Sequence, residues 1–351
     1  MSEVKTSPRA INTAAFDTLW GNMRLKRILI SAASQGALCH AYIFEGAAGS
    51  GRHTAAMLTA MAAACRSERV PCLVCESCRK LKAGISPDFI TVLPEGDRKT
   101  LGVDPIRELA ETIYIAPNDL DVKFYLIPDA DNMTPQAQNA LLKMLEEPPS
   151  GVYFMLLCEN SANLLPTVKS RAPILKLQKF SDEELSRLLL ENEKNAVKLK
   201  AADKDTFERC IKLADGSVGE ALRLLDARKS ARTGSIYERV DTFFRLLASG
   251  SRAEFTAYAV SLSDKRDERA ELVELLGLVA VGARDLLTYK YGVTTPRAFF
   301  VDAPAATALA AKFSAERLHT VACRADAARY DVQSNANITT ALTALAAGLN
   351  K

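Results

Sequence analysis

The chain has 351 residues, which is enough for two or three domains with buried cores. Its 48% hydrophobic and 25% charged residues are ordinary for a globular protein and exclude a disordered, collagen-like or fibrous chain. The formal net charge is only +3, so composition alone does not indicate a protein that binds a polyanion over its whole surface.

The amino-terminal segment and the cysteines bear on location. Residues 1–16 are polar and lack the apolar core of a secretory signal, and no run of apolar residues is long enough to predict a membrane span. Four of the eight cysteines are clustered between positions 65 and 78, whereas a small secreted protein would spread its cysteines along the chain. We therefore expect a cytoplasmic protein with one metal cluster.

Short apolar segments alternate with helix-length segments in the first half of the chain. This alternation predicts βαβ units and a parallel sheet. Helices are predicted at Asn22–Ser34 and Arg52–Ala64. The predicted strands are Ala41–Phe44, Asp88–Leu93, Lys123–Ile127, Val152–Leu157 and Ile174–Leu177.

A further helix has well-defined ends. Thr134 can cap its amino terminus, Pro135 suits its first turn, and Pro148 with Pro149 prevents its continuation. The leucines at positions 141, 142 and 145 give this helix an apolar face, which we expect to pack against the sheet.

No strand is predicted after about Lys179. A helical region begins near Ser181, and a polar break at Arg228–Ser235 separates it from a helical remainder. We therefore place domain boundaries after residues 178 and 231. An apolar stripe at helical spacing marks the start of the remainder: Ile236, Val240, Phe243, Phe244 and Leu247.

A glycine-rich loop at positions 46–51 follows the first strand of the sheet and precedes a helix, which is the setting of a phosphate-binding loop. Such a loop requires a Lys after its last glycine and then a Ser or Thr for Mg²⁺. Here those positions hold Arg52 and His53, and Thr54 comes one place too late. We expect that ATP hydrolysis has been lost, whereas nucleotide binding without hydrolysis remains open.

The acidic position beyond the strand Lys123–Ile127 has also changed. Asp129 stands where an ATPase orients Mg²⁺, but the adjacent position, which would hold the carboxylate that polarises water, is Ala130. Asn160, after the next strand, is either a sensor of the γ-phosphate or a turn residue. The predicted degenerate nucleotide site comprises Gly46, Gly49, Gly51, Arg52, Thr54 and Asp129.

The cysteine cluster has the spacing of a metal site. Cys65, Cys72, Cys75 and Cys78 lie in a polar segment, and four thiolates at this spacing can surround one Zn²⁺ tetrahedrally with no open position for catalysis. Free thiols and a redox site are the alternatives. We predict structural zinc in a module that displays a surface to partners.

Four stretches together resemble the clamp-loader subunits of bacterial DNA polymerase III, which belong to the AAA+ class. The motor subunits of that family, gamma and tau, keep the Lys, Thr and Glu that this chain lacks, and their lid arginine is replaced here by Gly219. The chain therefore resembles the family's non-hydrolysing branch. The stretches are His40–Phe44, the four-cysteine cluster, Asn139–Pro149 and Leu165–Arg171, with weaker likeness at Gly216–Leu222 and Asn335–Leu342.

The resemblance implies an α/β plus all-α architecture. An AAA+ domain at 1–178 would carry the zinc module at 65–78, a small helical lid would occupy 179–231, and a helical collar at 232–351 would assemble subunits into a ring. It also implies that Arg171, with Ser170, is offered in trans to the ATP site of a neighbouring motor subunit, where it would offset developing phosphate charge. Ala172 stands where the family usually has Cys.

The implied partners are gamma/tau and delta subunits, with the sliding clamp and primer–template DNA reached through the complex. The chain would then be an accessory subunit of the polymerase rather than an ATPase. Two alternatives stay open at this point: a weakly active motor subunit, and a zinc-bearing DNA-binding protein without ATP-linked function. The near-neutral charge argues against the second alternative.

Overall fold

A computed structural model describes residues 9–96, 100–225, 227–262, 269–292, 299–300, 303–334 and 336–349. The chain divides into two compact units. The first contains Met1–Ser181 with Ser217–Glu220, and the second contains Asp182–Gly216 with Ala221–Lys351. The predicted boundary after residue 178 thus lies three residues from the division at 181, whereas the predicted boundary after residue 231 stays a prediction.

The first unit is built on a five-stranded parallel sheet, as predicted. Its strand order is β4-β5-β6-β2-β7, so β2 lies between β6 and β7 in the sheet although it precedes both in the chain. This order brings the carboxyl ends of β5, β6 and β2 next to one another. The strands are β2 (Ala41–Glu45), β4 (Phe89–Thr91), β5 (Lys123–Ile127), β6 (Val152–Cys158) and β7 (Ile174–Lys176).

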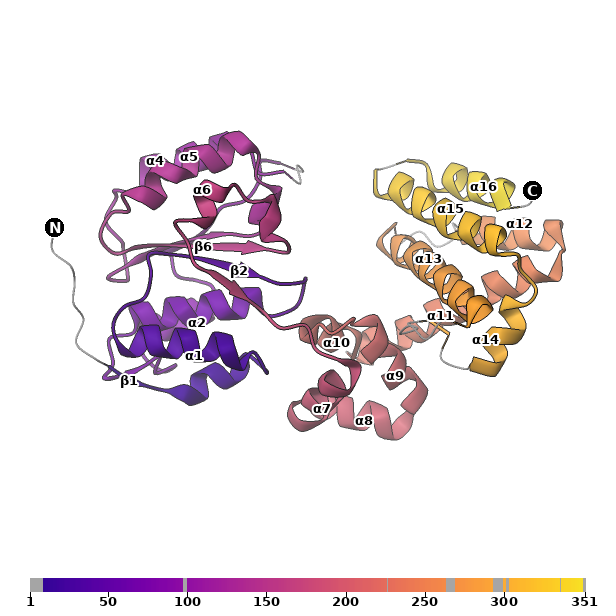
Figure 1. Ribbon diagram of the computed structural model, residues 1–351, viewed down its shortest axis with the longest axis horizontal. Helices are drawn as coiled ribbons and strands as arrows, with labels where there is room; N and C mark the ends of the chain where they lie inside the picture. Colours follow the sequence, from indigo (N-terminus) through magenta and orange to yellow (C-terminus); the bar gives the residue numbers. More distant parts are fainter. Residues whose placement is uncertain are drawn as a thin grey trace. The chain divides into compact units, whose positions relative to one another are not determined.

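Helices cover both faces of this sheet (Figure 1). The helices α1 (Met23–Ser34) and α2 (Arg52–Ala64) contribute to one apolar cluster, which includes Leu29 and Phe44. The opposite face packs against α4 (Val103–Thr112), α5 (Pro135–Glu146) and α6 (Pro166–Lys169). Burial on both faces explains why the central strands read as continuous apolar runs.

The predicted ends of α5 are confirmed. The Thr134 hydroxyl accepts a hydrogen bond from the backbone N–H of Ala137 at 3.1 Å, and Pro135 is the first helical residue. Leu141 and Leu145 are buried in the sheet-facing core, whereas Leu142 is half-buried. This helix brings Glu146, at its last turn, to the edge of the unit's surface.

Several short elements were not predicted. β1 (Ala10–Ile11) pairs in parallel with β3 (Arg69–Val70), and a short helix, α3 (Glu76–Lys82), follows them. Three 3₁₀ turns complete the unit: η1 (Thr13–Thr18), η2 (Ala130–Asn132) and η3 (Ser161–Asn163). Strands of two residues are too short to show a periodic pattern, so sequence reasoning could not detect them.

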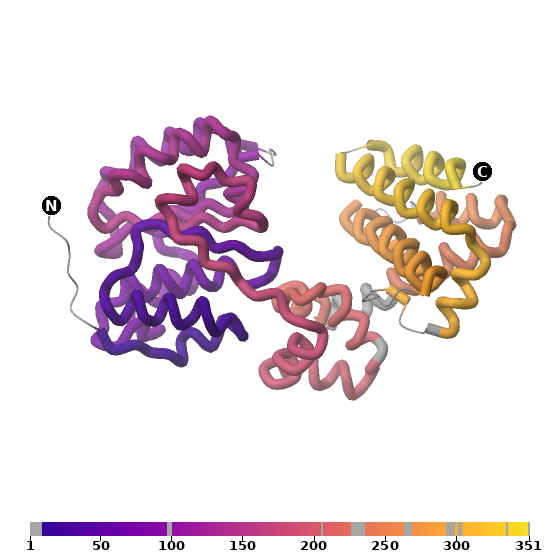
Figure 2. The backbone as a smooth tube through the Cα atoms, in the orientation of Figure 1, coloured from indigo at the N-terminus to yellow at the C-terminus, as the bar shows by residue number. Residues whose placement is uncertain are grey.

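The second unit is helical throughout its described residues (Figure 2). The predicted polar break at Arg228–Ser235 is wrong, because α11 runs continuously through it. Arg, Lys and Ala are good helix formers, so a polar sequence there is no barrier to helix. The helices are α7 (Asp182–Asn192), α8 (Lys194–Ala202), α9 (Lys204–Leu213), α10 (Val218–Leu225), α11 (Ala227–Ser249), α12 (Arg252–Ser261), α13 (Arg269–Tyr291), α14 (Ala303–Ala310), α15 (Ala315–Gln333) and α16 (Ile338–Leu349).

The predicted apolar stripe on α11 is confirmed as core. Its five residues are all at least 97% buried, and they pack with the apolar residues of α13, α15 and α16 in one cluster. Asn335, where the resemblance to the family's last helix begins, lies outside the described residues. Among the helices described, none combines the length and apolarity needed to span a bilayer.

Candidate functional site

The glycine-rich loop lies between the carboxyl end of β2 and the first turn of α2. Gly49 and Gly51 have φ values of +71° and +100°, in the left-handed region that favours glycine, and Gly51 caps α2. A Cβ atom on Gly49 would lie 2.5 Å from the Ser217 hydroxyl oxygen. The loop therefore makes a tight turn that requires glycine, and it is closely covered by residues far away in the sequence.

Ser217–Glu220, which belong to the same unit, form that cover. The backbone N–H of Gly219 donates to the carbonyl oxygen of Gly49 at 2.8 Å, and the Ser217 hydroxyl donates to the carbonyl of Ala48 at 2.9 Å. A Cβ atom on Gly219 would lie 2.7 Å from the Gly49 oxygen. Gly219 stands where the motor subunits of the family that this chain resembles have their lid arginine. The close backbone contact leaves no room for a side chain at this position.

Arg52 replaces the lysine of a working loop, and its guanidinium lies between two carboxylates. Its Nη2 atom is 3.9 Å from Oδ1 of Asp129 and 3.8 Å from Oε1 of Glu159. The Arg52 side chain is only 11% exposed, and its Nη1 atom is buried without a hydrogen-bond partner among the described residues. The start of α2 and the carboxyl ends of β5 and β6 thus place one cation and two acids together.

The other positions predicted for nucleotide chemistry do not converge on this cation. Ala130 is fully buried and offers no carboxylate. Asp131 does not face this cation: its Oδ2 atom accepts the backbone N–H groups of Glu159 and Asn160, each at 3.1 Å. The Asn160 side chain accepts from the N–H of Ala162 at 2.9 Å, which favours the turn-residue interpretation. Thr54 lies half-buried in the first turn of α2.

Glu159 was missed by sequence reasoning as a site residue. It follows β6 directly, and β6 adjoins β2 in the sheet, so the topology carries its carboxylate to Arg52. The signal that could have found it is the rule that ligand sites lie at the carboxyl ends of parallel strands where the strand order reverses. Applying that rule requires the strand order, which the sequence does not give.

Arg171 lies apart from this cluster, just after α6. Its Nη1 atom donates to the backbone carbonyl of Thr167 at 2.8 Å and to the Ser170 hydroxyl at 3.2 Å, and its Nη2 atom donates to Glu146. The side chain is 31% exposed. Ala172 is buried, so the position where the family usually has Cys is a packing position here.

The four clustered cysteines are brought together. Their sulfur atoms all lie within 4.8 Å of one another, with Cys65 and Cys75 at 3.9 Å and Cys72 and Cys78 at 4.0 Å. A tetrahedral zinc site with Zn–S bonds of about 2.3 Å has sulfur atoms about 3.8 Å apart. The geometry of the donor set therefore fits Zn²⁺, and Cys65, Cys72, Cys75 and Cys78 would hold it as a structural ion.

Backbone N–H groups donate hydrogen bonds to the sulfur atoms of this cluster. The N–H of Cys75 donates to Cys72 Sγ at 3.2 Å, and the N–H of Cys72 donates to Cys65 Sγ at 3.4 Å. Although burial opposes ionisation, hydrogen bonds from Ser67 and from backbone N–H groups lower the pKa of Cys72 to about 6. Burial raises the pKa of Cys78, whose thiol is the innermost of the four. A metal ion would supply the charge that stabilises the remaining thiolates.

The remaining cysteines are divided between core and surface. Cys158 and Cys210 are buried, and burial raises the pKa of Cys158 to about 12 and that of Cys210 to about 11. Cys39 and Cys323 are exposed. No disulfide joins any cysteine, and all eight lie in the described part of the chain.

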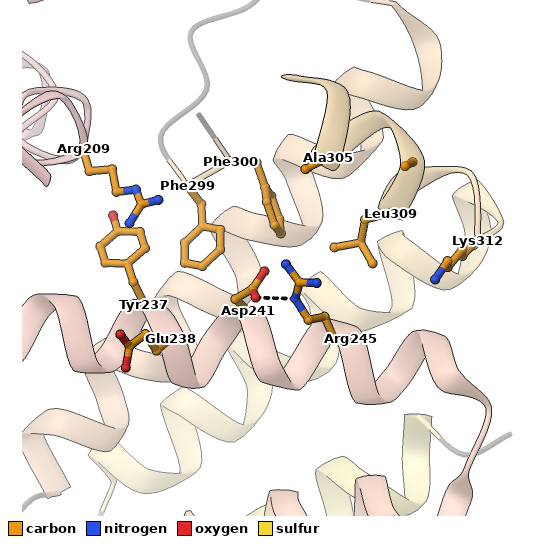
Figure 3. Close-up of a pocket in the computed structure, with 11 residues that line it drawn as sticks. Arg209, Tyr237, Glu238, Asp241, Arg245, Phe299, Phe300, Ala305, Leu309 and Lys312 are labelled. Carbon is orange, nitrogen blue, oxygen red and sulfur yellow. Dashed lines mark hydrogen bonds and ion pairs between the residues drawn. The ribbon is translucent and has the colours of Figure 1, made fainter. Parts of the chain in front are cut away.

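A cavity of about 630 Å³ lies in the second unit (Figure 3). Its wall on α11 carries an ion pair in which Arg245 donates to Asp241, and the Arg209 guanidinium lies 5.5 Å from the ring centroid of Tyr237. Cations and carboxylates are mixed along the wall, so the lining selects no single class of ligand. None of the predicted site residues lies in this cavity, which is lined by Arg209, Tyr237, Glu238, Asp241, Arg245, Phe299, Phe300, Ala305, Ala308, Leu309 and Lys312.

Comparisons with known proteins find subunits of bacterial DNA polymerase III. A family model described as DNA polymerase III, delta subunit, matches residues 21–181. The chain is 32% identical over 215 residues to the gamma/tau subunit of DNA polymerase III from Mycoplasma pneumoniae, a match that covers 60% of this chain and 30% of that protein. It is 33% identical over 171 residues to the delta' subunit from Bacillus subtilis, covering 48% of this chain and 51% of that protein.

The chain thus spans about a third and about half of the lengths of these two relatives. A solved structure of a gamma subunit-related protein from Thermotoga maritima aligns with 94% of this chain and 98% of its own, at 18% identity and a TM-score of 0.47. Both subunit types are similar to this chain, so similarity alone does not choose between them.

Proposed function

Because the chain belongs to the AAA+ clamp-loader family of DNA polymerase III subunits related to gamma and tau, we propose that it is a subunit of the delta' type. Such a subunit is a stator: it helps to hold a ring of subunits whose ATP-driven work loads the sliding clamp onto primed DNA. Its own nucleotide site does not hydrolyse ATP.

The observation that carries this proposal is the place of Arg52. Its guanidinium stands beside Asp129 and Glu159, the carboxylates that would otherwise be free to orient Mg²⁺. The planar guanidinium of Arg52 is no equivalent of the compact Lys ammonium of a working loop, and His53 stands where that loop needs a hydroxyl for Mg²⁺. The adjacent position that would activate water is the buried Ala130, so no carboxylate is available there as a general base.

The clamp-loader role gives Arg171 a partner outside this chain. We expect its guanidinium to reach the ATP site of a neighbouring gamma/tau subunit, where an arginine in trans offsets charge on the transferring phosphoryl group. The other partners would be the delta subunit, with the sliding clamp and primer–template DNA reached through the complex. Structural zinc, a helical lid, a helical collar and a cytoplasmic location complete the proposal.

The first test is ATP turnover by the isolated chain. A gamma/tau subunit serves as the positive control, and the expected result is no turnover above a protein-free blank. The triple variant Arg52→Lys/His53→Thr/Ala130→Glu asks whether restoring the three missing groups is enough to recover turnover. Motor-like turnover by the wild-type chain would reject the stator role.

The second test concerns Arg171 in the assembled complex. Arg171→Ala should lower ATP turnover by the neighbouring motor subunit by on the order of 10³-fold. Lys169→Ala, which removes a cation two residues before Arg171, is the matched control and should leave turnover unchanged. If Arg171→Ala leaves both turnover and clamp loading unchanged, the trans role of this arginine is wrong.

A weakly active motor subunit of the gamma/tau type is the second candidate. The similarity to the Mycoplasma pneumoniae gamma/tau subunit favours it, because that match is as strong in identity as the match to delta'. The turnover measurement separates the two candidates directly.

A further inference from the structure

Glu146 occupies an unusual position for an acidic residue. It is the last residue of α5, where the helix dipole is negative, and a carboxylate is unfavourable at that end of a helix. Pro148 and Pro149 come directly after the capping residue Glu147, so the helix cannot extend to move the charge away from its terminus. A compensating cation is therefore expected nearby, and that cation is Arg171, whose Nη2 atom donates to Glu146 Oε1.

The adjacent acidic residue does not share this contact. Glu147 is exposed at the carboxyl cap of α5 and has no described hydrogen bond or ion pair with Arg171, although both residues lie in the described part of the chain. The two neighbouring glutamates thus have the same chemistry and different surroundings. This pair provides an internal control for any effect of charge alone.

The contacts of Arg171 fix its guanidinium from two helices. Nη1 donates to the carbonyl of Thr167, in α6, and to the hydroxyl of Ser170, which caps that helix. Nη2 donates to Glu146, in α5. A guanidinium has five N–H groups, so these three hydrogen bonds leave two N–H groups for another acceptor. The side chain is 31% exposed, and that of Glu146 is 47% exposed, so the pair lies at the surface and within reach of solvent.

From this arrangement we infer that Glu146 is the positioning residue for Arg171: it holds the guanidinium in one orientation before the neighbouring subunit's ATP arrives. A long side chain that is already ordered loses less conformational freedom when it engages phosphate, which lowers the barrier of the step it assists. The inference rests on the proposed trans role of Arg171 and adds the residue that prepares it.

Positioning makes a specific kinetic prediction. Glu146 does not contact the neighbour's nucleotide directly, so its loss should lower kcat of the assembled complex and leave KM for ATP unchanged. The expected loss for Glu146→Gln is about tenfold, the scale of one hydrogen bond to a charged group. Glu146→Asp keeps the charge on a shorter side chain and should recover part of the activity.

The experiment compares complexes assembled with gamma/tau and delta subunits. They carry the wild-type chain, Glu146→Gln, Glu146→Asp, Glu147→Gln, Arg171→Ala or the double variant Glu146→Gln/Arg171→Ala. Thermal unfolding of each chain and size-exclusion chromatography of each complex test folding and assembly. A lower kcat can then be distinguished from a failure to assemble the ring. Glu147→Gln should match the wild type, and Glu146→Gln should add nothing once Arg171 is absent.

The outcomes separate the two ideas. If Arg171→Ala impairs turnover but Glu146→Gln does not, the positioning inference is wrong, whereas the proposed trans role of Arg171 remains supported. An equal loss from Glu146→Gln with and without Arg171 would also overturn it, because the glutamate would then act by another route. If neither variant has an effect, the trans role itself fails and the inference fails with it.

Discussion

At the scale of single residues, the contact between Gly219 and Gly49 holds the glycine-rich loop against a segment that lies far away in the sequence. The two glycine backbones touch through a 2.8 Å hydrogen bond, and neither position leaves space for a Cβ atom. Glycine at these positions is therefore a packing requirement as well as a conformational one. The same contact ties residues 49 and 219 together within the first unit.

We expect Gly219→Ala to destabilise the first unit by about 1–3 kcal/mol, because its Cβ would lie 2.7 Å from the Gly49 oxygen. Gly277→Ala in α13 is the matched control. Its Cβ would make ordinary contacts at 3.7 Å with Arg329, and removing a helical glycine should stabilise the chain by about 0.5–1 kcal/mol. Urea denaturation measures both changes, and equal effects at the two sites would contradict the packing argument.

Asp88 is a second residue whose role only contacts reveal. The sequence placed it at the start of a strand, but β4 begins at Phe89, and the fully buried Asp88 carboxylate accepts the backbone N–H groups of Asn118, Asp119 and Leu120 at 2.7–2.8 Å. Burial raises its pKa, but these hydrogen bonds outweigh burial and hold the pKa below its usual value.

The lowered pKa of Asp88 makes a pH prediction. The ionised form is favoured by folding, so its stabilisation is fully present above the unfolded-state pKa of about 4 and is lost as the pH falls through the lower folded-state value. Asp88→Asn should cost about 1–3 kcal/mol at pH 7, and the difference from wild type should shrink below about pH 4. Asp104→Asn, which removes an exposed pair with Arg107, should change stability by less than about 0.5 kcal/mol. A difference for Asp88→Asn that does not vary with pH would contradict this account.

At the scale of elements, the cysteine module and its surroundings form one small assembly. Cys65 caps the end of α2, Cys75 caps the start of α3, and β3 lies between them and pairs with β1. Arg66 joins the module to the loop before β5 through two hydrogen bonds to Asp121, at 2.7 and 2.6 Å. Cys65, Val70 and Cys78 are buried in the same apolar cluster as α1 and α2, so the module is anchored to the core of the first unit.

We expect one Zn²⁺ per chain, bound by the four sulfur atoms. Removing it with a strong chelator should lower the thermal midpoint of the first unit, because metal binding stabilises only the folded state. Cys75→Ser should reduce the zinc content, whereas Cys39→Ser, which changes an exposed cysteine outside the cluster, should not. Elemental analysis and thermal melts provide the measurement, and a zinc content far below one per wild-type chain would reject the site.

At the scale of the whole molecule, the apolar cores are built from separate stretches of chain. Two clusters cover the faces of the sheet and use residues 15–177, and a third uses residues 236–349 of the helical unit. The single tryptophan, Trp20, belongs to the first unit. Its fluorescence therefore reports on one core, whereas far-UV circular dichroism reports on both.

This division predicts that core substitutions act locally. Phe243 is fully buried in the helical unit, so Phe243→Ala should cost about 3–5 kcal/mol there. The transition seen by circular dichroism should shift, while the transition seen by Trp20 fluorescence should stay in place. Phe44→Ala, in the sheet core, is the reciprocal variant and should move the fluorescence transition. Transitions that shift together for both variants would show that the units unfold as one.

Elements whose cause is local could be predicted from the order of residues in the chain. Alternating apolar runs gave the five sheet strands, Thr134 with Pro135 gave the start of α5, and the stripe from Ile236 to Leu247 gave a core helix. The four cysteines were predicted as a cluster because their spacing is short. The prediction of a break at Arg228–Ser235 was wrong because it rested on polarity alone, and polar residues do not stop a helix.

Only the tertiary structure decided which distant residues meet. Strand order brings Glu159 and Asp129 to Arg52, and chain crossover brings Gly219 to Gly49 and Glu146 to Arg171. Each pair joins segments whose separation in sequence carries no periodic signal, and their contacts depend on how sheet and helices pack. The chemistry of the individual residues could be read from the chain, whereas the partner of each one is a property of the fold.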